Sequence, residues 1–330
     1  MTLKADTKFD IIKKFSIIVL ILFFSFPVYI MKIQTGLDQS WVYMLSESFD
    51  KWIFGKDIFF TYGPLGFLAN AVPINNSKFI NLFFNLCLFL YQGFLLYRYA
   101  CYFTVKRVFW SGFLIFLTSI VFYSFSSEYY FEYIVLLSLN LTLLENKLKF
   151  YLYSISCFLI LLAAYIKFNL AVSLLCVLVC FLISSYFLDK SNLRKYAIGF
   201  ALIPILFFLS YLIYNPSLPN FFAYIHAALD LASGYNVAMS VESPISSLAL
   251  SIIGLGLWIV LFALELVFRR NDAFHTLLFI PAIFFAFKHG VVRGDSGHNF
   301  MFFYAFFYFL LLNAFLLLEK ILFCHKIKIC

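Results

Sequence analysis

The chain has 330 residues, of which 64% are hydrophobic and 12% are charged, and its formal net charge is +8. Soluble domains have about 45–50% apolar and about 25% charged residues, so the composition excludes a soluble protein. The positive charge does not indicate a nucleic-acid partner, because the topology described below accounts for its placement, and we expect no nucleic acid to bind.

Apolar runs long enough to cross a bilayer, about 17–25 residues each, recur along the chain. We predict spans near 15–31, 79–97, 108–125, 129–144, 150–166, 168–188, 196–214, 246–268, 273–287 and 299–318. The first run follows several lysines, but no small-residue cleavage site comes after it, so it is interpreted as an uncleaved span. The sequence therefore predicts an all-α integral membrane protein with about ten transmembrane helices in a single polytopic domain over residues 1–330.

The breaks between these spans carry unequal charge. When they are assigned alternately to two sides, most of the 24 basic residues fall on the side of the N-terminus. The positive-inside rule makes that side cytoplasmic, so both termini are predicted to be cytoplasmic. The outer loops are then about 32–78, 126–129, 215–245 and 288–298. We predict a multipass protein of a bacterial inner membrane.

The first outer loop has the pattern of an amphipathic surface helix, because Trp41, Leu45, Phe49 and Trp52 recur at helical spacing. Asp38 falls at or just before the N-terminus of this helix, where free amides and the helix dipole favour a carboxylate. Asp38 is therefore a candidate for a helix cap and, equally, for a catalytic acid.

Aromatic residues and a rigid turn follow in the same loop. Pro64 lies between two glycines in "TYGPLGF", which predicts a fixed turn. Trp41 and Tyr62 have faces on which a sugar can stack, although interfacial aromatic belts are the commoner reason for such residues. Lys167 lies at the tight turn between two spans and is a further binding candidate.

Two more outer loops contain pairs of polar residues at helical spacing. Glu128 and Glu132 are one turn apart at the mouth of a span, where carboxylates need partners. His226 and Asp230 share one face of a second predicted amphipathic helix, in the fourth outer loop, before Gly234 ends it. This pair is either catalytic or simply solvated, and the pairing alone favours solvated.

The last outer loop, "KHGVVRGDSGHN", combines basic, acidic and imidazole groups within one turn at the end of a span. The candidate binding residues are Lys288, His289, Arg293, Asp295 and His298. A lysine and an arginine together suit a phosphate group. Anchoring to lipid headgroups is the alternative, but anchoring does not require the histidines and the aspartate.

These residues carry a resemblance to known proteins. An acidic residue after the first span, a surface helix, Gly-Lys-Asp and Gly-Pro-Leu resemble the first outer loop of the GT-C (C-fold) glycosyltransferases. The segments "LDQSW", "GKDIFFTYGPLGFL", "SGYNVAMS" and "KHGVVRGDSGH" more closely resemble a family of bacterial multipass membrane proteins of uncharacterised function, which we associate with that superfamily.

The resemblance implies a GT-C-like fold and a sugar transfer that uses a polyprenyl-phosphate-linked donor and a glycan or lipid acceptor. Asp38 would match the catalytic acid of the first loop, and Glu128 or Glu132 the acidic position of the second. The chain is shorter than expected of such enzymes. No cofactor and no metal site follow from the spacing of residues, although Asp38 would be able to help position a divalent cation in place of acting as a base.

Two other functions remain open from the sequence. A polymerase of lipid-linked polysaccharide repeat units would use the same cluster around Lys288 and Arg293. A transporter or flippase of lipid-linked sugars would need charged groups within the spans, for which Lys167 and Glu265 are the candidates.

Overall fold

The computed structural model describes residues 11–16, 18–19, 37–100, 127–238, 245–268, 270–293 and 302–303. Contacts within the chain define two compact units, one made of Val28–Leu88 and Ser126–Glu242, the other of Met1–Pro27, Phe89–Phe125 and Ser243–Cys330. Each unit is described by itself. The prediction of a single domain stays a prediction.

The described helices of the first unit occupy most of its length. They are α2 (Leu37–Lys51), η2 (Gly66–Leu68), the start of α3 (Ser77–Ala100), α5 (Ser127–Leu144), α6 (Lys149–Ile166), α7 (Phe168–Leu188), η3 (Lys190–Asn192), α8 (Leu193–Tyr214) and α9 (Leu218–Ala238). The second unit contains α10 (Ile245–Phe268), α11 (Arg270–Thr276) and α12 (Phe279–Arg293).

Among the described residues, six helices are long and apolar enough to cross a membrane, so the chain is a multispanning membrane protein. They are Ser77–Tyr99, Lys149–Ile166, Phe168–Leu188, Lys190–Tyr214, Ile245–Phe268 and Arg270–Val291. Each corresponds to a predicted span. The predicted spans at 108–125, most of 15–31 and nearly all of 299–318 lie outside the described residues, so the count of about ten stays a prediction.

The predicted span at 129–144 forms a shorter apolar helix, α5, at the centre of the first unit. Every side chain from Tyr130 to Thr142 is buried, against α6 and α7 among others. Hydroxyl groups join α5 to α6, because the Ser156 hydroxyl lies 2.9 Å from that of Ser138. Small hydroxylated residues of this kind are common between membrane helices.

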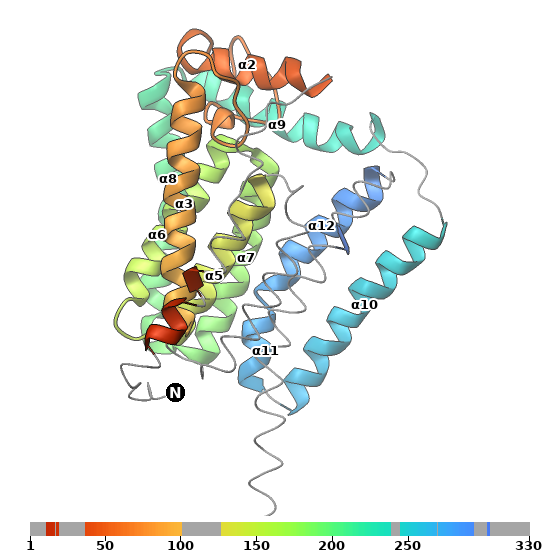
Figure 1. Ribbon diagram of the computed structural model, residues 1–330. Helices are drawn as coiled ribbons and strands as arrows, with labels where there is room; N and C mark the ends of the chain where they lie inside the picture. Colours follow the sequence, from red (N-terminus) through yellow and green to blue (C-terminus); the bar gives the residue numbers. More distant parts are fainter. Residues whose placement is uncertain are drawn as a thin grey trace, which may run out of the picture. The chain divides into compact units, whose positions relative to one another are not determined.

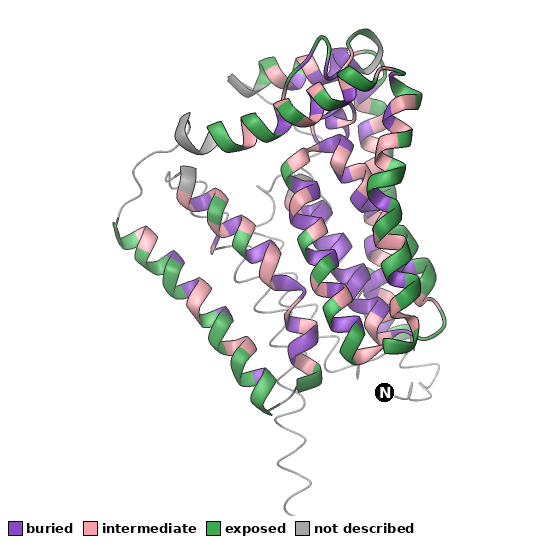
Figure 2. Ribbon diagram, turned by 180° about the vertical axis from the view of Figure 1, so that it is seen from behind, coloured by how far each residue is buried: buried purple, intermediate pink, exposed green. Residues whose placement is uncertain are grey.

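The outward faces of the spanning helices are apolar. Exposed side chains recur along α8, for example Ile205, Leu209 and Ile213, and along α10, for example Ile253 and Leu257. Figure 2 shows this contrast by colour: buried residues gather inside the helix bundle of the first unit, and exposed residues recur along its outer helices. Such faces are suited to lipid, because hydrocarbon solvates them without cost.

Helices α2 and α9 lie across one end of the bundle that α6, α7 and α8 form (Figure 1). They correspond to the two predicted surface helices, but one boundary was wrong. Gly234 does not end α9, which continues to Ala238. A glycine inside a helix lowers helix stability by only about 1 kcal/mol relative to alanine, so the remaining residues of α9 keep the helix formed.

The start of the predicted last outer loop is also helical, because α12 extends to Arg293. Lys288 therefore lies in a helix and not in a turn. The buried positions Ile283, Ala286 and Gly290 keep helical spacing past Lys288, which explains why the helix continues.

Candidate functional site

The loop between α2 and α3, residues 52–76, forms a strap over the turn that joins α6 to α7. The Gly63 amide donates a hydrogen bond to the Ile166 carbonyl at 3.1 Å, and the Phe168 amide donates to the Thr61 carbonyl, also at 3.1 Å. These bonds pair backbone groups that a helix end leaves without intrahelical partners. The strap is thus fixed to the ends of two membrane helices.

Two glycines permit this close approach. Gly55 has φ +86°, and a Cβ there would lie 2.1 Å from the Asn220 carbonyl oxygen. A Cβ on Gly63 would lie 2.3 Å from the Tyr224 hydroxyl and 2.6 Å from the Tyr165 carbonyl oxygen. Close packing therefore explains the first two glycines of "GKDIFFTYGPLGFL", Gly55 and Gly63.

Tyrosines from α8 and α9 donate hydrogen bonds to the strap and to the end of α6, next to the turn between α6 and α7. Tyr214 donates to the Trp52 carbonyl at 3.1 Å, and Tyr211 donates to the Phe54 carbonyl. Tyr224 donates to the Ala164 carbonyl, near the end of α6, at 3.0 Å. Burial raises the pKa of Tyr224, so its hydroxyl stays protonated and continues to donate.

Lys167 meets the strap because its backbone is extended between the two helices, with φ −155° and ψ 123°. In this conformation it forms an isolated antiparallel bridge with Tyr62. The Lys167 ammonium lies 4.6 Å from the centroid of the Tyr62 ring and 3.4 Å from its hydroxyl. A cation over an aromatic face is attracted to it.

Two further rings extend this contact into an aromatic–lysine cluster, made of Trp41, Phe60, Tyr62 and Lys167. The Trp41 ring stacks on the Tyr62 ring with centroids 5.0 Å apart. The Phe60 ring also stacks on the Tyr62 ring, with centroids 5.7 Å apart. Tyr62 is buried, whereas Trp41, Phe60 and Lys167 are partly exposed. The cluster therefore combines partly exposed aromatic side chains with a partly exposed cation.

Asp38 belongs to the first turn of α2, since this helix begins at Leu37. Its side chain lies outside the described residues. Asp38 precedes Trp41 by three positions, a spacing that makes residues neighbours on a helix surface, with Cβ atoms about 5–6 Å apart. The predicted catalytic acid thus has its backbone one turn away from the aromatic–lysine cluster.

The predicted apolar face of α2 was only partly right. Leu45 is buried and Trp41 partly buried, but Trp52 is exposed. The structure also buries Glu47, a charged residue of the same helix, which is 8% exposed. Glu47 pairs with Lys51 and accepts a hydrogen bond from Asn75 at 3.4 Å. The strap folds back over α2, and the hydrophobic pattern gives no signal of this polar contact.

Glu132 is buried in the bundle and not open at a helix mouth, with 4% of its surface exposed. Its carboxylate accepts a hydrogen bond from Ser173 of α7. Glu128 lies in the first turn of α5, and its side chain is outside the described residues. Glu132 therefore interacts with other helices inside the bundle. The spacing of Glu128 and Glu132 in the sequence gave no signal of this burial.

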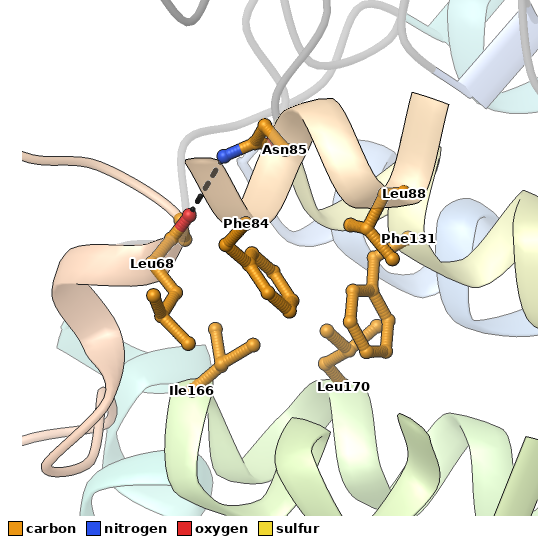
Figure 3. Close-up of a pocket in the computed structure, with 8 residues that line it drawn as sticks. Leu68, Phe84, Asn85, Leu88, Phe131, Ile166 and Leu170 are labelled. Carbon is orange, nitrogen blue, oxygen red and sulfur yellow. Dashed lines mark hydrogen bonds between the residues drawn. The ribbon is translucent and has the colours of Figure 1, made fainter. Parts of the chain in front are cut away.

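A small pocket lies beside the strap, between α3, α5 and α7. It has about 10 Å³ of space for a water-sized molecule, and its lining is Leu68, Ala69, Phe84, Asn85, Leu88, Phe131, Ile166 and Leu170. Figure 3 shows the Asn85 amide directed at the Leu68 carbonyl, to which it donates at 3.2 Å. The volume admits roughly one water molecule, so the pocket is no substrate site.

His226 and Asp230 meet on α9, as the spacing predicted. The His226 Nδ1 and Asp230 Oδ2 atoms are 2.8 Å apart, and the side chains are 79% and 67% exposed. Both groups are therefore well solvated. This high exposure agrees with the interpretation that the pairing favoured, a solvated pair on the helix surface.

The remaining predicted site residues belong to the second unit. Lys288 is exposed and His289 partly exposed on α12. The backbone of Arg293 ends α12, its side chain lies outside the described residues, and Asp295 and His298 lie wholly outside them. In the described part of the chain no group of three or more His, Cys, Asp or Glu residues is arranged to hold a metal ion.

Sequence reasoning missed two parts of the site. Phe60 was not singled out, although it lies two residues from Tyr62 in an extended segment and thus on the same side of it. Tyr224 was missed because a buried anchoring tyrosine has no pattern of its own in an apolar helix. The turn signal in "TYGPLGF" did locate one of the two segments where a glycine permits close packing, the one around Gly63.

The fold and the site thus define a multispanning α-helical membrane protein with a strap at one end of a helix bundle. No family model, no curated protein and no solved structure matches the chain.

Proposed function

We propose that this protein is a membrane glycosyltransferase, which moves a sugar from a polyprenyl-phosphate-linked donor to an envelope glycan or lipid at the outer face of a bacterial inner membrane. The observation that carries the proposal is the aromatic–lysine cluster. A sugar ring presents apolar C–H groups that stack on aromatic faces, and the donor phosphate is an anion. The cluster provides partly exposed rings and a lysine within one small area.

The position of the cluster supports a lipid-linked substrate. It lies where the strap meets the ends of two candidate membrane spans, α6 and α7. A polyprenyl chain remains in hydrocarbon while its phosphate stays at the polar surface. Lys167 lies directly before α7, whose N-terminal amides add partial positive charge at the same place.

Asp38 is the proposed catalytic residue. Its carboxylate would take the proton from the acceptor hydroxyl as that oxygen bonds to the anomeric carbon, and the bond from this carbon to the donor phosphate would break. The phosphate then leaves with increased negative charge, which Lys167 would stabilise. A direct displacement inverts the anomeric centre.

Other candidates have smaller roles in this proposal. Glu132 is buried and would support the bundle beneath the site. Glu128 would orient the acceptor hydroxyl. Lys288 and Arg293 stay predicted contacts of the lipid phosphate, on the charge argument alone.

Buried carboxylates favour a second candidate, a transporter or flippase of lipid-linked sugars. Glu132 and Glu265 are 4% and 3% exposed, and both lie in apolar helices. Ionisable groups inside membrane helices often mark transport paths. We rank this function second, because the partly exposed cluster lies at the end of the bundle and not along its interior.

Lipids extracted from cells distinguish these functions. We would compare cells that lack the protein with cells that carry only Asp38→Asn, using Lys56→Gln, an exposed lysine of the strap, as the matched control. Mass spectrometry would quantify polyprenyl-linked sugars, and immunoblotting would confirm equal protein levels.

A transferase predicts that a monosaccharide on polyprenyl phosphate accumulates in the null and Asp38→Asn cells but not in the control. Accumulation of complete oligosaccharides on diphosphate would instead indicate a polymerase. Accumulation of a lipid-linked sugar in the null cells but not in the Asp38→Asn cells would favour the flippase. Unchanged pools of lipid-linked sugars in all cells would refute the transferase, the polymerase and the flippase.

A further inference from the structure

We propose that the first unit has a second binding site, for the headgroup of an anionic phospholipid, at the end where α6 and α8 begin. We call this the basic end. Its basic residues are Lys147, Lys149, Lys190, Arg194 and Lys195. The lipid site does not depend on the proposed sugar transfer, because α6 separates it from the strap by the length of a helix.

Short contacts bring these residues together from separate segments. The Lys195 ammonium, in α8, lies 4.4 Å from the ring centroid of Phe150, in α6. Tyr153 of α6 donates a hydrogen bond to the Tyr196 carbonyl of α8. The two helices therefore begin side by side, and their first turns share one surface.

The acidic groups of this end already have partners. Asp189 accepts hydrogen bonds from Lys149 at 3.0 Å and from Tyr196 at 2.8 Å. Glu145 is buried, and its Oε1 atom accepts from the amides of Asn146 and Lys147 at 3.1 and 3.2 Å. These two carboxylates therefore leave most of the local basic charge uncompensated.

Four cations remain exposed at the basic end: Lys147, Lys190, Arg194 and Lys195. None of them forms an ion pair with a residue that the structure describes. Arg194 and Lys195 lie in the first turn of α8, where the helix dipole disfavours positive charge. An anion bound here would relieve repulsion among the cations and between them and the helix end.

Exposed aromatic residues identify the anion as part of a lipid. Tyr151 is 71% exposed and Tyr186 48% exposed, and the Lys190 ammonium lies 5.1 Å from the Tyr186 ring centroid. Rings at the ends of membrane spans are typical of the headgroup region, in which a phosphate and acyl chains occur together. A free phosphate would use the cations and leave these rings in water.

The test uses the purified full chain in detergent, titrated with dioctanoyl phosphatidylglycerol and, separately, with phosphatidylcholine. Native mass spectrometry would measure the bound lipid. Each basic residue near an anionic lipid surface contributes a factor of about five in affinity, so Arg194→Gln should weaken phosphatidylglycerol binding about fivefold and Arg194→Gln/Lys195→Gln about 25-fold.

Matched variants make the result decisive. Lys56→Gln removes an exposed lysine far along the chain and should leave binding unchanged, while Arg194→Lys keeps the charge and should retain most of it. Equal binding of phosphatidylcholine, an equal loss in Lys56→Gln, or displacement of the lipid by inorganic phosphate would each overturn the proposal. Size-exclusion profiles that match the unsubstituted protein confirm that every variant is folded.

Discussion

The two ends of the α6–α7–α8 bundle are built by different means. At the strap end, backbone hydrogen bonds and aromatic contacts join segments far apart in sequence, such as Tyr62 with Lys167 and Trp52 with Tyr214. At the basic end, side-chain hydrogen bonds join Asp189 to Lys149, Asn192 and Tyr196. The strap end is held by backbone contacts and close packing, whereas at the basic end an ionised carboxylate adds to the packing of Tyr153 against Tyr196.

This difference separates two tasks. Close packing without many charges fixes a surface in one shape, which a reaction at a defined atom requires. A set of exposed cations on long side chains instead adapts to mobile headgroups. The contrast therefore supports the two proposals separately, sugar transfer at the strap end and lipid binding at the basic end.

Glycine substitution should test the packing of the strap end most severely. Gly63→Ala places a methyl group against the Tyr224 hydroxyl and the Tyr165 carbonyl, and Gly55→Ala adds strain at positive φ. Each should lower the free energy of unfolding by about 1–3 kcal/mol. Thermal unfolding in detergent, followed by circular dichroism, measures the change.

Gly234→Ala serves as the control, because nothing lies within 4 Å of a Cβ there. This change in a helix should be neutral or stabilise by up to about 1 kcal/mol. If all the glycine variants unfolded at the same temperature, the strap would not be packed as described.

Removing the cation of the cluster tests its proposed chemistry. In a protein whose only tryptophan is Trp41, made by changing Trp52, Trp110 and Trp258 to phenylalanine, a polyprenyl phosphate should alter the fluorescence. Lys167→Met should weaken this binding about tenfold or more, since hydrogen bonds to charged groups contribute about 1.5–3 kcal/mol. Lys56→Gln should bind normally; a loss as large as that of Lys167→Met would attribute binding to general charge.

Some of this architecture could be predicted from the sequence. The apolar runs located the spans, because a helix that crosses a bilayer needs apolar residues at almost every position. The segment "TYGPLGF" located the turn of the strap, because glycine and proline directly determine which backbone conformations are allowed. The burial of Glu47 could not be predicted, because it depends on Asn75 and the strap folding back. The same holds for the bridge between Tyr62 and Lys167, which joins residues 105 positions apart.

Asp189→Asn tests whether charge holds the basic end. Burial opposes ionisation of Asp189, but hydrogen bonds from Asn192, Lys149 and Tyr196 outweigh it and lower its pKa below the usual 3.8. The ionised form therefore stabilises the fold fully above about pH 4, and this contribution disappears as the pH falls through the lowered pKa.

We expect Asp189→Asn to lose about 1 kcal/mol at pH 7, because the variant lacks the negative charge that pairs with Lys149. The gap between the variant and the unsubstituted protein should narrow at pH 3, as measured by thermal unfolding at both values. A gap independent of pH would attribute the effect to shape and not to charge.

The smallest effect is expected for His226→Ala, because this exposed residue of α9 belongs neither to the packed strap nor to the basic end. The ion pair with Asp230 spans one turn of α9 and is largely exposed. Water screens such pairs, which contribute about 0.3–0.5 kcal/mol in helices. The unfolding temperature should therefore change little, and the lipid-linked sugar pools of cells that carry His226→Ala should stay normal. Accumulated donor would show instead that the exposed imidazole takes part in the reaction, and the catalytic surface would then have to include α9.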